Sequence, residues 1–189
     1  LRFTSGSEQE IKDKISGPIQ DIGEQLKIDF IIAGRDYPLH STLLEGLYEG
    51  QDAVVRDNLF ENLAESSEIA KITDGLLGER LIYKYLLLDK GNLLLTAIDI
   101  PAHLINFREE LAKLYLGNGL KPLPLDNLLH ISLARMVQIL EENKQSKFNI
   151  YCKRFTQLRH DISSNPLSLE IVSLSASSAF HLLHELKKD

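Results

Sequence analysis

The first apolar pattern along the chain has the period of a helix. Isoleucine and leucine recur at steps of three or four residues, at Ile11, Ile15, Ile19, Ile22 and Leu26. This spacing places them on one face of a helix that covers residues 8–26. Because proline lacks a backbone N–H and clashes with the preceding turn, Gly17-Pro18 either kinks this helix or starts it afresh.

Three later segments also have the spacing of helices: residues 52–64, 101–117 and 147–162. The first of these has the weakest pattern. The second opens at Pro101 and is followed by Gly117-Asn118-Gly119, and these residue types are typical of helix ends. We therefore predict helices along much of the chain, separated by shorter extended segments.

Short apolar segments bounded by glycine or proline predict strands. They are residues 27–34, 39–44, 69–77, 80–88, 92–98, 129–135, 167–174 and 178–186. Gly75, Gly78 and Lys90-Gly91 separate the three in the middle, so we expect an antiparallel meander there, with a hairpin turn at Gly75-Leu76-Leu77-Gly78.

The two halves of the chain show the same order of elements. Each has a helix, an approach led by proline, a strand that contains a histidine, another helix and further strands. Lengths and order favour an α+β fold with antiparallel sheets and outer helices. The sequence thus predicts two pseudo-symmetric lobes around a central cleft, with residues 1–189 as a single bilobal domain.

Charge and cysteine content narrow the classes of function. The 189 residues include 27 acidic and 21 basic side chains, for a net charge of -6, which does not suit long duplex nucleic acid but permits a small phosphorylated ligand. Cys152 is the only cysteine, which excludes an internal disulfide and a thiolate zinc site within one chain. With no apolar run that could cross a bilayer and no secretory signal in the first residues, we expect a cytoplasmic monomer without a membrane partner.

One short pattern occurs in both halves. Leu39-His40-Ser41-Thr42-Leu43 and Leu129-His130-Ile131-Ser132-Leu133 share Leu-His-x-(Ser/Thr)-Leu. Side chains two apart on a strand point the same way, so each motif presents an imidazole and a hydroxyl on one face. If the halves are related by a two-fold axis, the two histidines face each other across a cleft, and the two hydroxyls can hold an anion between them.

This arrangement suits cleavage of a phosphodiester without a metal. Histidine can take or give a proton near neutral pH, because its pKa is about 6.5. The hydroxyls of Thr42 and Ser132 can donate to the non-bridging phosphate oxygens. In the approaches to the motifs, Tyr37 is a candidate for stacking on a base, and Arg35 and Lys121 are candidates for phosphate contacts; each can equally be a solvated loop residue.

The paired motifs resemble the signature of the 2H phosphoesterases. The second motif, continued to Ala134-Arg135, is similar to that of the bacterial RNA 2′,3′-cyclic phosphodiesterases, often called 2′-5′ RNA ligases. The resemblance implies that His40 and His130 act as acid and base, in an order left open, on a 2′,3′-cyclic phosphate of a small nucleotide or an RNA end, without a cofactor. It also implies that Leu1-Arg2-Phe3-Thr4 is the remnant of a first strand and that residues 167–174 form a closing strand.

Other charged residues and histidines are interpreted as structural. His103 and His160 lie in predicted helices, and the order His181-x-x-His184-Glu185 does not match the zinc protease pattern, so we expect no metal site. Strand alternation would point Arg135 away from the histidine face, into a structural ion pair.

Two rival hypotheses stay open. The same cleft could bind a nucleotide without turning it over. Alternatively, the chain could be an unrelated α+β protein whose paired motifs are a coincidence, in which case His40 and His130 would lie far apart.

Overall fold

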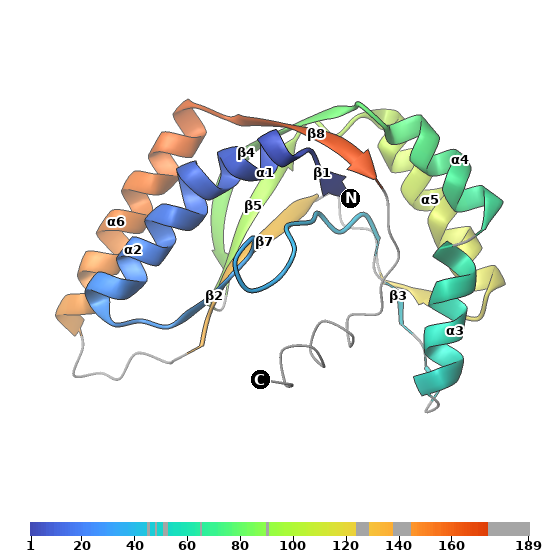
Figure 1. Cartoon of the computed structure of the whole chain (residues 1–189), viewed down its shortest axis with the longest axis horizontal. Helices are drawn as coiled ribbons and strands as arrows, with labels where there is room; N and C mark the ends of the chain where they lie inside the picture. Colours follow the sequence, from blue (N-terminus) through green and yellow to red (C-terminus); the bar gives the residue numbers. More distant parts are fainter. Residues whose placement is uncertain are drawn as a thin grey trace.

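The chain folds into helices packed on antiparallel sheet, as shown in Figure 1. The computed structural model describes residues 1–44, 46–47, 49–50, 53–64, 66–89, 91–123, 129–137 and 145–173. The predicted α+β class is confirmed. Within these ranges, no helix has the length and apolar character needed to cross a membrane.

Six strands form one curled sheet, a half-barrel, in the order β1-β8-β4-β5-β7-β2. Their bounds are β1 Arg2–Phe3, β2 Phe30–Ile32, β4 Arg80–Asp89, β5 Asn92–Ile98, β7 His130–Met136 and β8 Leu167–Ser173. Every neighbouring pair in this sheet is antiparallel. A separate pair, β3 (Gly46–Leu47) with β6 (Lys121–Pro122), completes the described strands.

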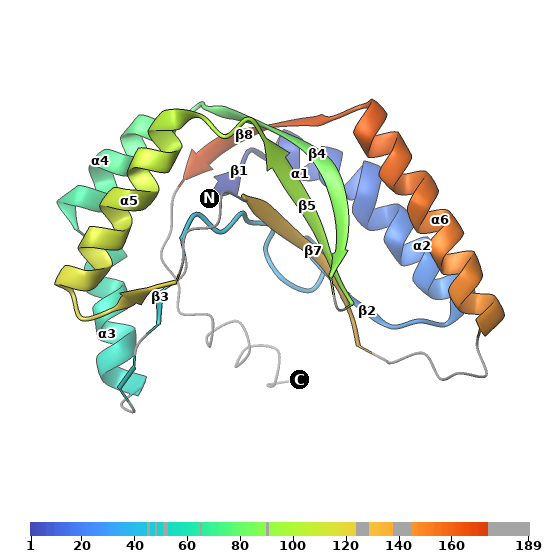
Figure 2. The same ribbon diagram turned by 180° about the vertical axis from the view of Figure 1, so that it is seen from behind.

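The helices lie in two groups, one at each flank of the sheet, and both views agree on this (Figures 1 and 2). On one flank are α1 Ser5–Ile11, η1 Lys12–Ser16, α2 Gly17–Leu26 and α6 Gln145–Ser164. On the other are α3 Ala53–Ala64, α4 Ser67–Leu76 and α5 Ala102–Gly117. Buried aliphatic and aromatic side chains of the helices and strands form one continuous core.

The first predicted helix is confirmed, and its interruption has a visible form. The turn before Pro18, η1, is π-helical, with Gly17 donating its backbone N–H to the Lys12 carbonyl. Pro18 has no N–H to bond to the Lys14 carbonyl and its ring crowds that position, so the chain accommodates an extra residue in the preceding turn. Lys27, with a φ of 54°, ends the helix in the left-handed conformation.

The strand predicted at residues 69–77 is wrong, because this segment is helix α4. The Ser66 hydroxyl accepts a hydrogen bond from the Ile69 N–H at 3.2 Å, which is a typical N-terminal cap. Ile69 and Leu76 are both buried, and a separation of two helical turns places them on one face. The expected meander is therefore the β4–β5 hairpin alone, closed by Gly91 with a φ of 85°.

The strand predicted at residues 39–44 is also wrong, apart from one bridge. Ser41 forms an isolated antiparallel bridge with Ile131 of β7. The bridge is isolated, so no ladder extends from this point along β7. The Ser41 N–H and C=O bond to Leu1 on the other side.

The remaining predicted elements are present with shifted bounds, while the proposed strand at residues 178–186 lies outside the described residues. The suggested first strand at Leu1-Arg2-Phe3-Thr4 corresponds to β1, which pairs with β8.

Candidate functional site

The bridge between Ser41 and Ile131 aligns the two histidine motifs side by side. In an antiparallel pair, residues on either side of a bridge run in opposite directions, so His40 lies opposite Ser132 and Thr42 opposite His130. Ser41 and Ile131 are both fully buried. The other four side chains are partly exposed, so burial alternates in the same way in both motifs and these four lie on the face opposite to Ser41 and Ile131. The structure therefore brings the two imidazoles and the two hydroxyls together.

Hydrogen bonds from the segment before and within the first motif fix this alignment. The Ser41 hydroxyl donates to the His130 carbonyl at 2.8 Å. The Tyr37 hydroxyl donates to the Ser132 carbonyl, also at 2.8 Å. The Ala33 N–H donates to the Leu133 carbonyl at 2.7 Å. We call these three bonds the β7 staples. In the first two, a side-chain hydroxyl donates where a backbone N–H would donate in a regular strand.

His40 is held in one tautomer and is poised to be neutral. Its Nδ1 lies 2.9 Å from the Pro38 carbonyl oxygen, and because a carbonyl can only accept, Nδ1 carries the hydrogen and Nε2 keeps the lone pair. Burial lowers the pKa of His40 below its usual 6.5, and nearby positive charge, on Arg2 and His130 among other groups, lowers this pKa further.

Arg135 lies on the histidine face, which corrects the sequence prediction. Between β5 and β7 the register shifts, so that Leu94 pairs with Ser132 while the adjacent Leu93 pairs with Ala134. This bulge leaves Leu133 and Ala134 both buried and reverses the alternation beyond it. Arg135 is therefore exposed on the same face as Ser132. No sequence pattern in this segment predicts such a bulge.

The three candidate substrate contacts have partners within the protein. The Tyr37 hydroxyl forms one of the β7 staples. Arg35 bonds to Asp36, at 2.7 Å at its closest, and to the Phe30 carbonyl. Lys121 pairs with Glu49 at 2.9 Å and belongs to the small sheet, outside the strands that carry the histidines. None of these contacts brings Arg35 or Lys121 to the histidine face.

The other histidines have contacts that suit structural roles. His103 Nε2 lies 3.4 Å from a Glu79 carboxylate oxygen, and His160 Nδ1 lies 4.0 Å from an Asp161 carboxylate oxygen. In the part of the chain that the structure describes, no three His, Cys, Asp or Glu side chains gather as metal ligands. His181, His184 and Glu185 lie outside that part.

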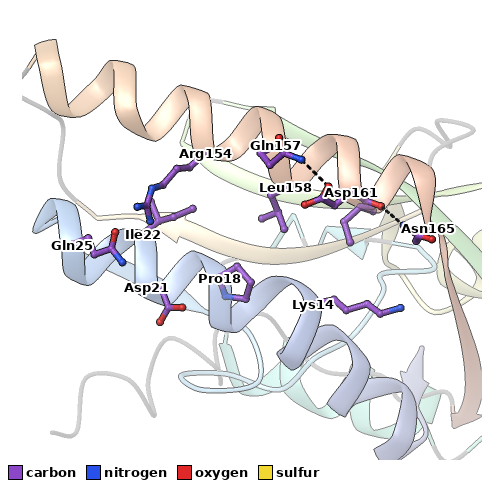
Figure 3. Close-up of a pocket in the computed structure, with 11 residues that line it drawn as sticks. Lys14, Pro18, Asp21, Ile22, Gln25, Arg154, Gln157, Leu158, Asp161 and Asn165 are labelled. Atoms are coloured by element: carbon purple, nitrogen blue, oxygen red, sulfur yellow. Dashed lines mark hydrogen bonds between the residues drawn. The ribbon is translucent and has the colours of Figure 1, made fainter.

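A groove of about 580 Å³ lies elsewhere, between α2 and α6 (Figure 3). Side chains from both helices point into it, with Ile22 and Leu158 on its floor and Arg154 and Asp161 among its polar groups. It includes neither histidine motif, and no histidine lines it. The candidate site is therefore the histidine face and not this groove.

In comparisons with known proteins, no family model matches the chain and no curated protein matches it.

Proposed function

We propose that the chain is a metal-independent phosphodiesterase of the 2H type, which hydrolyses 2′,3′-cyclic phosphates of small nucleotides or RNA ends. One observation carries the proposal: the Ser41–Ile131 bridge sets two copies of a histidine-hydroxyl pair side by side on one partly exposed face. Cleavage of a phosphodiester needs one group that accepts a proton and one that donates it. Two adjacent imidazoles provide both.

His40 is the general base in this proposal. Its Nδ1 hydrogen is engaged with the Pro38 carbonyl, and its lowered pKa keeps the ring neutral at pH 7. Nε2 takes a proton from water as the water oxygen bonds to phosphorus. His130, protonated, gives a proton to the ribose oxygen as its bond to phosphorus breaks. Loss of O3′ would leave a 2′-phosphate, the product that the 2H resemblance implies.

The groups around the histidines stabilise the charge that develops on the phosphate. Thr42 and Ser132, each opposite a histidine across the bridge, donate to the non-bridging oxygens. Arg135, brought to this face by the bulge in β7, supplies a positive charge farther along the same strand. We include Arg135 in the proposed site in place of Arg35 and Lys121.

The proposal extends to the architecture and setting of the molecule. We infer that the two groups of helices, one at each flank of the sheet, correspond to the two lobes of a bilobal domain over residues 1–189. The substrate is then a free nucleotide or an RNA terminus, and the protein acts as a cytoplasmic monomer.

The test is turnover of 2′,3′-cyclic nucleotides by the parent and by His40→Ala and His130→Ala. Each variant should lose about 10²- to 10⁴-fold in kcat, the range for removal of a general acid or base, while its melting temperature stays near that of the parent. His160→Ala is the matched control, because His160 is exposed on α6, and it should turn over like the parent.

Two outcomes would contradict the proposal. If both variants keep near-normal rates, catalysis lies elsewhere. If cyclic nucleotides raise the melting temperature of the parent but are not consumed, the site is a non-catalytic nucleotide-binding module.

A further inference from the structure

Tyr85 lies in the same cross-strand row as His130, on the same face of the sheet. Tyr85 of β4 pairs with Thr96 of β5, and Thr96 pairs with His130 of β7. Residues directly opposite each other on neighbouring strands share a face. With strands about 4.8 Å apart, two strand spacings separate the backbone of Tyr85 from that of His130.

A bulge in β4 is what brings Tyr85 to this face. Tyr83 pairs with Ala97 and Tyr85 pairs with Thr96, so one extra residue, Lys84, lies between them. Tyr83 is consequently fully buried, whereas Tyr85 is 44% exposed. In a regular strand the two rings would point the same way, so the sequence alone does not reveal the exposed one.

The surroundings of Tyr85 fit a flat aromatic ligand. Thr96, between Tyr85 and His130, is 2% exposed, and its hydroxyl donates to the Tyr85 carbonyl at 3.2 Å, so it forms a low floor between the two larger side chains. Leu87 and Ile82 remain exposed on the same strand, where their partners Leu94 and Ile98 place them on the Tyr85 side.

The opposite side of these strands carries core residues, because Leu86, Leu95 and Ile131 form the adjacent cross-strand row and are fully buried. In Figure 2, β4, β5 and β7 lie in front of α1 and α2. The ring of Tyr85 also has a cation beside it, because Lys84 Nζ lies 5.8 Å from its centroid. A cation over an aromatic ring is attractive and helps to fix the ring in one orientation.

We propose that the Tyr85 ring is a stacking platform for the base of a nucleotide whose phosphate lies between His40 and His130. The inference rests on the proposed function and deepens it: the substrates are phosphodiesters that carry a nucleobase, and base-free cyclic phosphates lack this contact. Stacking tolerates all four bases, because each has a π-face. The site therefore selects for the presence of a base and not for its sequence.

The test compares two substrates, a nucleoside 2′,3′-cyclic phosphate and the base-free glycerol 1,2-cyclic phosphate. Tyr85→Ala should raise KM for the nucleotide about tenfold, within the range for loss of one base stack, with little change in kcat. KM for glycerol 1,2-cyclic phosphate should not change. Tyr85→Phe keeps the ring and should behave as the parent with both substrates.

Leu88→Ala is the matched control on the same strand and should have the KM of the parent. Leu88 is 43% exposed, but it pairs with Leu93 on the opposite face of the sheet.

The outcomes separate this inference from the proposed function. If the parent hydrolyses the nucleotide and Tyr85→Ala has the same KM as the parent, the platform is overturned and the phosphodiesterase stands. If the parent hydrolyses neither substrate, the phosphodiesterase fails, and the dissociation constant of the nucleotide is measured by calorimetry. A weaker constant for Tyr85→Ala, with Tyr85→Phe unchanged, then sustains the platform. Equal constants, or no binding, overturn it.

Discussion

At the scale of single residues, His40 combines a fixed tautomer with a lowered pKa. Its Nδ1 is engaged with Pro38, and burial disfavours the imidazolium form. A general base must be neutral to accept a proton, so activity is lost as the pH falls through its pKa. The lowered pKa therefore moves the acid limb of the profile to pH values below 6.5.

This gives a prediction for the pH dependence of the proposed activity. As the pH falls from 7 to 6.5, kcat/KM for a 2′,3′-cyclic nucleotide should decline less than it would for a base with the usual histidine pKa of 6.5, and the acid limb should have its midpoint below 6.5. The measurement is a profile of kcat/KM at constant ionic strength. A midpoint at or above 6.5 would mean that His40 is not the base, or that its surroundings favour the imidazolium.

The residues of the site were predictable to unequal degrees. His40, Thr42, His130 and Ser132 follow from a repeated pattern, and the bridge between the motifs places them together. Arg135 was assigned to the wrong face. The bulge in β7 that turns it depends on pairing with β5, a long-range contact that strand alternation in one segment cannot show.

At the scale of elements, local sequence patterns predicted most of the helices and strands. The predictions that failed concern segments whose apolar residues fit more than one secondary structure. Residues 69–77 have apolar side chains that suit a strand, but the Ser66 cap and burial at Ile69 and Leu76 make them helical. A short apolar run fits both structures, and neighbouring elements decide between them. The segment around Ser41 was predicted as a strand, yet it forms only an isolated bridge with Ile131 of β7, and the Ser41 N–H and C=O bond to Leu1.

The junction of α2 with β2 gives a prediction at this scale. A Cβ at Gly23 would lie 2.8 Å from the Ile28 carbonyl oxygen and 3.0 Å from the Phe30 ring. Gly23→Ala should therefore lower the free energy of unfolding by about 1–3 kcal/mol, because the backbone cannot yield cheaply. Gly6→Ala is the matched control in α1: nothing lies within 4 Å of its added Cβ, so stability should rise by up to about 1 kcal/mol.

Urea denaturation of both variants measures the difference. If Gly23→Ala is as stable as Gly6→Ala, the close approach of α2 to the chain before β2 is not as tight as the structure has it.

At the scale of the whole molecule, the two halves of the sequence meet within one sheet. Strand β7, from the second half, pairs with β5 from the first half, and through Ser41 it contacts the first motif. The sequence predicted that the histidines would converge, from the similarity of the halves. It could not predict that the meeting point would be a single bridge, because such pairing depends on where distant segments pack.

Removal of the Ser41 hydroxyl tests whether this bridge holds the two halves of the molecule in place. The Ser41 side chain is fully buried and donates to the His130 carbonyl in a partly buried hydrogen bond, so Ser41→Ala leaves this acceptor without its donor. Such a loss costs about 1–3 kcal/mol, and the free energy of unfolding should fall by that amount. Since the same bond aligns His40 with Ser132, kcat for a cyclic nucleotide should also fall in the folded variant. Ser163→Ala is the control, because the Ser163 hydroxyl makes only a 3.5 Å contact with the Lys84 carbonyl. If Ser41→Ala and Ser163→Ala match the parent in both stability and kcat, the two histidines do not depend on this bond for their alignment.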